Sequence, residues 1–460
     1  MTNPDRSVTP MMAQFLKIKE EYPAALLFYR MGDFYELFFD DAVAAAQALD
    51  ITLTKRGKHL GDDIPMCGVP VHAAEGYLLN LIRKGFRVAV CEQLENPKEA
   101  KKRGAKSVVR RGVVRLVTPG TLTEDTLLHP RQSNFLAAFA QVRDQSCLAW
   151  LDISTGDVRY SPCPVMRLGP ELARLAPAEV LISDTATPEL LEVIADSGAS
   201  STPLAQTMFD SAAGVERLAT AFGVSTLDGL GDFGRADIAA LGALIEYLTA
   251  TQKGQLPLLR QPQCEARDDF VAIDAATRRN LELTQTLSGE KSGSLLSVVD
   301  RSVTAAGARL LYRRVTTPSQ RLDTIDERAA SVQFLCEKSG VRAALRYALQ
   351  RLPDIERALG RLALERGGPR DLVSLSNGMV QATEVYELLE KHDLPKLLEG
   401  SKAALVGHEA LSSELGQALV ADPPLMARDG GFVATGYSAE LDEVTSLRDK
   451  ARSVIAGMQA

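Results

Sequence analysis

Phe34 and Glu36, an aromatic ring and a carboxylate, stand two positions apart at the boundary between a strand-type and a helix-type apolar pattern. The apolar run 26–30 is typical of a short strand, Gly32-Asp33 interrupts it, and residues 34–49 carry apolar side chains at helical spacing. Positions two apart do not share a helix face, so we expect Phe34 and Glu36 to project elsewhere if the apolar residues around them enter a core. The spacing alone favours the alternative, in which an aromatic residue that opens a helix is itself part of the core.

A stripe of basic residues is the second feature that could bind a ligand. The chain has a net charge of −7, yet residues 1–115 carry 18 Lys+Arg against 14 Asp+Glu, a balance of +4, so the rest carries −11. Within 98–115 the acid Glu99 accompanies eight basic residues: Lys98, Lys101, Lys102, Arg103, Lys106, Arg110, Arg111 and Arg115. Such a stripe can contact phosphates, with binding that weakens steeply as salt rises. A solvated loop is the alternative, and charge alone leaves both open.

Two glycine-containing stretches match nucleotide-binding motifs only in part. Residues 229–234 have the spacing G-x-G-x-x-G, but no apolar strand leads into them, which speaks against a dinucleotide site. Gly57-Lys58 is the one Gly-Lys pair of the chain, with Thr52 where a P-loop has its first glycine and His59 where it has Ser or Thr. We therefore expect no ATP site in these 460 residues.

The residues that could ligate a metal are dispersed. Asp152 ends a predicted strand, but a two-metal nuclease needs several converging carboxylates, and we favour a role for Asp152 in the turn. The five histidines and six cysteines stand at no ligand spacing, so we expect no zinc site. Scattered cysteines, the lack of a secretory signal and the lack of a membrane-length apolar run predict reduced, mostly buried thiols in a cytoplasmic protein.

The elements that must position these residues fall into three regions. The first alternates strands with helices: helix 11–21 after a start at Thr9-Pro10, strand 26–30, helix 75–84, and strands 86–91 and 113–117. The second has a β-β-β-α-β order, typical of a mixed sheet: strands 134–141, 147–153 and 158–160, helix 168–175 and strand 179–182. The third, from about residue 265, is helical: 276–287, 304–315, 322–350, 354–365 and 370–391.

Several long motifs resemble the MutS family of DNA mismatch-repair proteins, from about residue 10 to the end of the chain. The segments that resemble its mismatch-binding domain are 28–41, 53–57, 64–72, 91–93 and 117–121. Those that resemble its core domain are 273–283, 428–432 and 436–437. The resemblance predicts a multidomain α/β plus all-α fold. Its expected domains are a mixed α/β mismatch-recognition domain (1–115), a ribonuclease-H-like α/β connector (116–257), a helical core/lever domain (258–441) and the start of a lever (442–460).

The resemblance also implies roles for particular residues. In this family the Phe of an F-x-E motif stacks on a mispaired base from the minor groove and the Glu accepts a hydrogen bond from that base, and Phe34 and Glu36 occupy these positions. It implies further DNA contacts for Met31, and phosphate or sugar contacts for Arg56, Lys55, Arg110 and Arg111. These implied roles favour an exposed Phe34 over a core one.

The same resemblance implies partners and cofactors. It predicts recognition of mispaired or looped-out bases in duplex DNA, docking of the partner MutL on the connector or core, and a homodimer in full-length members, with no membrane. Full-length members are ATPases that use ATP and Mg²⁺, whereas this chain is expected to hold no catalytic site and to lack the clamp and ATPase domains. The rival interpretation is an interaction protein that keeps the core without reading DNA.

Overall fold

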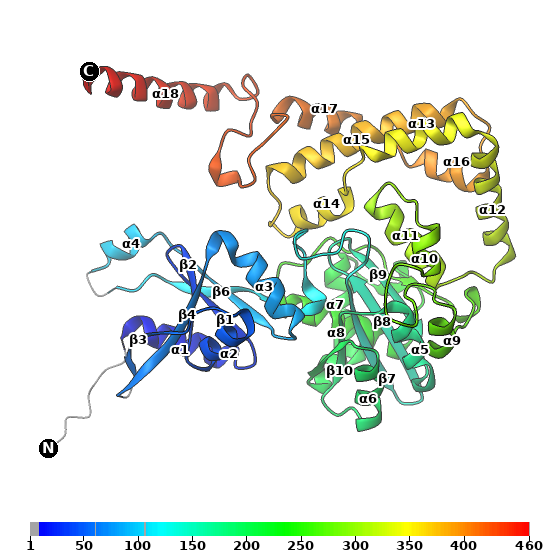
Figure 1. The fold of residues 1–460 in the computed structure, drawn as a ribbon, viewed down its shortest axis with the longest axis horizontal. Coiled ribbons are helices and arrows are strands. Elements are labelled where there is room, and N and C mark those ends of the chain that lie inside the picture. Colours follow the sequence, from blue (N-terminus) through cyan, green and yellow to red (C-terminus); the bar gives the residue numbers. More distant parts are fainter. Residues whose placement is uncertain (1–8, 60, 105–106, 460) are drawn as a thin grey trace. The chain divides into compact units, whose positions relative to one another are not determined.

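The computed structural model describes residues 9–59, 61–104 and 107–459. They form two compact units, one that extends to residue 298 and includes 315–317, and one made of 299–314 and 318 onward. The first unit contains two six-stranded sheets and the second is helical (Figure 1). The predicted combination of α/β domains with an all-α region is confirmed.

The first sheet has the strand order β3-β4-β2-β1-β5-β6. Its strands are β1 Leu26–Met31, β2 Phe34–Phe38, β3 Thr54–His59, β4 Asp62–Pro70, β5 Val88–Gln93 and β6 Arg111–Val117. Strands β1 and β5 are parallel, and the other neighbouring pairs are antiparallel. The sheet therefore brings β2, early in the chain, between β1 and β4, and leaves β3 as an edge strand.

Helices cover both faces of this sheet (Figure 1). Helix α1 (Pro10–Glu21) packs Met12, Phe15 and Ile18 against one face, where Tyr29 and Phe38 are buried. Helices α2 (Phe39–Leu49) and α3 (Ala74–Arg83) pack against the side chains of the other face. The predicted start of α1 is confirmed, because Thr9 caps the helix and Pro10 is its first residue.

The prediction of a helix that begins at Phe34 is wrong. Residues Phe34–Phe38 form strand β2, which pairs antiparallel with β1 on one side and with β4 on the other. The α-helix begins only at Phe39. Backbone hydrogen bonds to two neighbouring strands hold the segment extended, and no local pattern contains that information. In a strand, positions two apart share a face, so Phe34 and Glu36 project together.

The second sheet has the order β11-β10-β7-β8-β9-β12. Its strands are β7 Phe135–Val142, β8 Gln145–Asp152, β9 Asp157–Pro162, β10 Glu179–Ser183, β11 Ser200–Leu204 and β12 Gln263–Cys264. The helices that accompany it are α5 Val165–Leu175, α6 Pro188–Asp196, α7 Ser211–Phe222 and α8 Arg235–Thr251. The β7-β8-β9 hairpins are antiparallel and β7, β10 and β11 are parallel, so the predicted mixed sheet is confirmed.

A buried polar network joins the segment between the two sheets to the second sheet. Glu179, on β10, is fully buried and its carboxylate accepts hydrogen bonds from the hydroxyls of Thr118, Thr202 and Tyr247 and from the Gly120 N–H. Burial, followed by the charge of Glu179, raises the pKa of Tyr247 well above its ordinary value, so this phenol remains a donor. A Cβ at Gly120 would lie 2.7 Å from Leu136 Cδ1 and 3.0 Å from Glu179, so a larger residue there would displace these buried side chains.

The elements after residue 274 are helical. They are α9 Ala275–Asn280, α10 Leu295–Val299, α11 Ala305–Thr316, α12 Leu322–Glu337, α13 Ser339–Gln350, α14 Ile355–Ala363, α15 Pro369–Glu390, α16 Lys396–Ala403, α17 Glu409–Ala418 and α18 Ala439–Gln459. Of these, α10, α16, α17 and α18 were not among the predicted helices, and two predicted helices have other bounds. The predicted helix 276–287 ends at Asn280 instead, followed by Glu282 in the left-handed region. The predicted helix 322–350 is two helices, because the backbone leaves the helical region at Lys338.

In the described part of the chain, no helix is both long and apolar enough to cross a membrane. The six cysteines are free thiols, and four of them are buried: Cys67, Cys91, Cys147 and Cys163. The prediction of mostly buried, reduced thiols is confirmed for these four, whereas Cys264 and Cys336 are exposed.

Candidate nucleic-acid interface

Phe34 is an exposed aromatic ring at the tip of the β1–β2 hairpin. The turn between the strands is Gly32-Asp33, and Gly32 has a φ of 62°, which glycine adopts without strain. Phe34 is 46% exposed, whereas the next residue, Tyr35, is 8% exposed and packs into the opposite face. Phe38 lies on the same face as Phe34 but is buried under α1, with its ring 5.0 Å from that of Phe15. Helix α1 thus covers one end of this face and leaves Phe34 at the open end.

Gly68, on the neighbouring strand β4, lies next to this ring. It pairs with Glu36 across β2 and β4, and a Cβ built at Gly68 would lie 3.7 Å from Glu36 Cγ and 3.9 Å from Phe34 Cδ1. A side chain at this position would therefore contact both residues. The glycine therefore leaves backbone, and no side chain, beside Phe34 and Glu36 on β4.

Arg56 reaches Glu36 from the edge of the sheet. Its guanidinium Nη1 forms an ion pair with Glu36 Oε2, although β4 lies between their two strands. The Glu36 side chain is 13% exposed and that of Arg56 is 41% exposed, so Arg56 is the more accessible partner. Its neighbour Lys55 pairs with Asp63 at 2.8 Å, and both of those side chains are exposed. Such an exposed pair contributes little to stability and leaves Lys55 accessible.

Arg111 and Met31 are bound into the hairpin. The guanidinium of Arg111 lies 4.9 Å from the centre of the Tyr29 ring, and its Nε donates to the carbonyl of Arg30 at 2.7 Å. Its Nη2 lies 3.2 Å from the sulfur of Met31, which is half-buried. Burial is the largest cause that raises the pKa of Tyr29 to about 12, and Arg111 opposes it. Arg111 therefore links β6 to β1. A phosphate contact, which the family resemblance implies for Arg111, would have to be made by the same guanidinium.

The basic stripe is partly neutralised by acids that lie outside it. Glu95 forms an ion pair with Arg103 and accepts the backbone N–H of Arg110 at 2.7 Å, and these hydrogen bonds lower the pKa of Glu95 to about 2. Arg115 pairs with Glu124. The side chains of Lys98, Lys102 and Arg110 are exposed, whereas the Lys101 side chain and Lys106 lie outside the described residues. The sequence count within 98–115 missed Glu95 and Glu124, because both stand beyond its ends.

The structure thus brings some of the expected site residues together and separates others. Phe34 and Glu36 lie beside Gly68, and Arg56 pairs with Glu36. The sequence patterns did not indicate either the ion pair or the glycine. Met31 pairs with Phe34 at the tip of the same hairpin, and the Arg111 side chain contacts the Met31 sulfur. The exposed Arg110 is held through its backbone by Glu95. The roles of all these residues toward DNA stay predictions.

The other candidate sites have structural explanations. Asp152 is fully buried and accepts hydrogen bonds from Ser154 N, Ser154 Oγ and Asn134 N, as expected for a residue that shapes a turn. Residues 229–234 are preceded by a 3₁₀ turn rather than a strand, and the Gly234 N–H donates to Asp237 at 2.9 Å. A carboxylate at this helix start does not suit a phosphate group. Among the described residues, no cluster of three His, Cys, Asp or Glu side chains could hold a metal ion.

The two mixed-sheet domains followed by helices define a multidomain protein whose first sheet places an exposed ring, a largely covered carboxylate and exposed cations close together. Models of the MutS family match the chain in the same order: MutS domain I over residues 9–126, MutS domain II over 134–260 and MutS domain III over 276–460. The chain belongs to the MutS family.

Curated relatives agree with this assignment. The DNA mismatch repair protein MutS of Roseobacter denitrificans is 60% identical over 453 residues, covering 98% of this chain and 52% of the relative. The proteins of the same name from Ruegeria pomeroyi and Paracoccus denitrificans are each 61% identical over 98% of the chain. The chain spans about half the length of the curated relatives it matches (52% and 51% for these two).

Proposed function

We propose that this chain recognises mispaired or looped-out bases in duplex DNA as the first step of mismatch repair. One observation carries the proposal: Phe34 is an exposed ring, beside the Glu36 carboxylate, on the same face of a β-strand. Membership of the MutS family supports it, and the resemblance of the F-x-E motif gives each residue its role. Cations along β3, namely Lys55, Arg56 and Lys58, would lie near the phosphates.

The physics of the duplex explains why an exposed ring would detect a mispair. An apolar wedge in the minor groove must unstack a base step and kink the helix, which costs a few kcal/mol. A mispaired base is already poorly stacked and paired, so this cost falls and the protein reads deformability rather than sequence. A carboxylate near DNA is repelled by phosphates, and Glu36 would therefore contribute discrimination rather than affinity.

The test compares three duplexes of one length: fully matched, with a single G·T pair, and with one looped-out base. Fluorescence anisotropy with the 460-residue chain is expected to give tighter binding to the second and third than to the first. Equal affinities would favour the rival function, an interaction protein that keeps the MutS core without reading DNA.

Glu36→Ala is expected to leave binding to matched duplex unchanged or stronger and to lower the ratio of mispaired to matched affinity. The carboxylate is repelled by phosphates on every duplex, but it accepts a hydrogen bond only from a mispaired base. Anisotropy titrations of both duplexes measure the two affinities. Asp63→Ala, which removes a carboxylate from the neighbouring strand β4, is the control and should keep the ratio. An equal fall in both affinities of Glu36→Ala would contradict the role.

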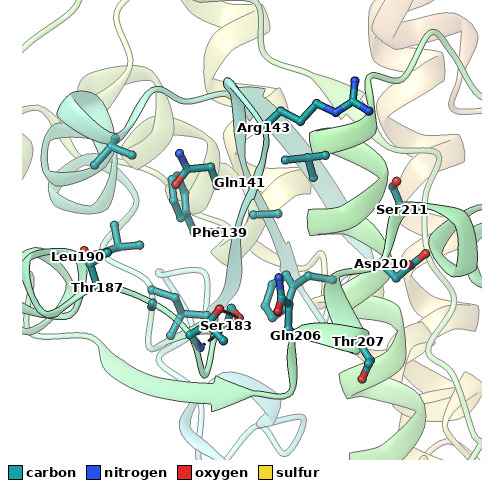
Figure 2. A pocket seen from close by; sticks show the side chains of 17 residues that line it. Phe139, Gln141, Arg143, Ser183, Thr187, Leu190, Gln206, Thr207, Asp210 and Ser211 are labelled. Carbon is teal, nitrogen blue, oxygen red and sulfur yellow. Dashed lines mark hydrogen bonds between the residues drawn. The ribbon is translucent and has the colours of Figure 1, made fainter.

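We further propose that the second sheet docks the repair partner MutL, at a groove between the carboxyl ends of β7 and β10 (Figure 2). These parallel neighbours continue in opposite directions, β7 to β8 and β10 toward β11, and such switch points commonly bind ligands. The groove has a volume of about 740 Å³, a buried apolar floor that includes Phe139 and Ile182, and a polar rim that includes Gln141, Arg143 and Gln206.

Arg143→Glu together with Gln206→Glu is expected to weaken capture of purified MutL at least tenfold, because the rim of the groove would lose one positive charge and gain two negative charges. Biolayer interferometry with immobilised chain measures this binding. Lys253→Glu, which lies outside the groove, is the control. Undiminished capture by the double variant would place the docking surface elsewhere. We likewise propose, from the family resemblance, that full-length proteins form homodimers and use ATP and Mg²⁺. The cytoplasmic location also stays a proposal.

A further inference from the structure

The Arg56–Glu36 ion pair sets two expected DNA contacts in competition. Under the proposed function, Glu36 accepts a hydrogen bond from a mispaired base and Arg56 contacts the phosphate backbone. In the structure each group instead neutralises the other. A guanidinium that moves to a phosphate leaves Glu36 uncompensated, and a carboxylate engaged by a base leaves Arg56 available.

We infer that Arg56 is a specificity-determining latch for Glu36, closed on matched DNA and opened only when a mispaired base takes over the carboxylate. This inference rests on the proposed function and adds a residue that senses whether Glu36 is engaged. With the latch closed, the pair is neutral and makes no strong contact with phosphates. With the latch open, the free guanidinium gains a phosphate contact, so recognition of the base adds backbone affinity that matched DNA does not receive.

The geometry of β3 suits Arg56 to be the moving partner. The strand is an exposed edge of the sheet. Its register with β4 shifts between Lys55 and Lys58, where Gly57 has a φ of 74°. Such a bulge changes the direction of the side chains next to it. Glu36, by contrast, lies in β2 between two neighbouring strands and is largely covered.

The surroundings of the pair are not crowded by the neighbouring strand. Gly68 presents no side chain next to the Glu36 Cγ, and Arg56, which pairs with the carboxylate, is itself 41% exposed. Removal of Arg56 would therefore uncover Glu36 without opening the core, and variants at position 56 are expected to fold normally.

The salt dependence of binding tests the latch, because each phosphate contact adds about 0.9 to the slope of log affinity against log salt. Slopes are measured by anisotropy on a matched duplex and on a G·T duplex for the wild-type chain, Arg56→Met, Glu36→Gln and the double variant. Lys58→Met serves as the control, since it removes a cation from the same exposed strand.

The latch predicts that Arg56→Met lowers the slope by about 0.9 on the G·T duplex and leaves the matched slope unchanged. It predicts that Glu36→Gln raises the matched slope by about the same amount, and that adding Arg56→Met removes this gain. Lys58→Met should act equally on both duplexes.

An equal fall on both duplexes for Arg56→Met would show a plain phosphate contact and overturn the latch. No change on either duplex would overturn it too. A failure of the proposed function looks different, because the wild-type chain would then bind both duplexes with the same affinity and Phe34→Ala would change nothing.

Discussion

Phe34→Ala is expected to remove the preference for mispaired duplex while the fold stays intact. A stacked base on an aromatic side chain contributes about 1–3 kcal/mol, so the ratio of mispaired to matched affinity should fall by roughly 5- to 150-fold. Because the ring is 46% exposed, its loss should change the free energy of unfolding by no more than about 0.5 kcal/mol. Anisotropy on both duplexes and urea unfolding measure the two effects.

Phe38→Ala is the matched control for this variant. It lies on the same strand and the same face, four residues on, but is 1% exposed and packs against Phe15. Its truncation should cost about 3–5 kcal/mol of stability. If Phe34→Ala instead destabilised the domain to this extent, the ring would be a core residue and the wedge role would be wrong.

Glu179→Ala is expected to produce a loss of stability comparable to that of Phe38→Ala, at least about 3 kcal/mol. The variant leaves the donors of Thr118, Gly120, Thr202 and Tyr247 buried without their common acceptor, and each unsatisfied buried group costs about 1–3 kcal/mol. Urea unfolding followed by circular dichroism measures the change.

Two further variants make this result specific to the network. Glu179→Gln keeps the shape and one acceptor oxygen, so its loss should be intermediate. Glu189→Ala removes an exposed carboxylate from the first turn of α6 and should leave the urea midpoint nearly unchanged. A wild-type midpoint for Glu179→Ala would mean that water replaces the carboxylate and that the network does not hold the turn at Gly120.

Residues 34–38 are the segment in which the predicted secondary structure, a helix, differs from the observed one, a strand. Its aromatic and apolar residues suit a strand as well as a helix, and the helical spacing of the residues that follow extended the predicted helix too far back. Pairing with β4, whose residues 66–70 lie some thirty positions further along, decides the matter. The predicted exposure of Phe34 was right for another reason: alternation along a strand, not rotation around a helix, turns it away from Tyr35.

The sequence by itself determined the features that depend on neighbouring residues. Thr9-Pro10 starts a helix, the β-β-β-α-β order gives a mixed sheet, and the F-x-E motif with its flanking segments indicates the family. Only the tertiary structure decided which distant residues meet: Arg56 with Glu36, Gly68 with Phe34 and Glu36, Glu95 with Arg103, and Glu179 with the turn at Gly120. Helix caps and periodicity act within a few residues. Strand pairing and buried polar contacts depend on the packing of segments far apart in the chain, and a single sequence does not specify these by spacing.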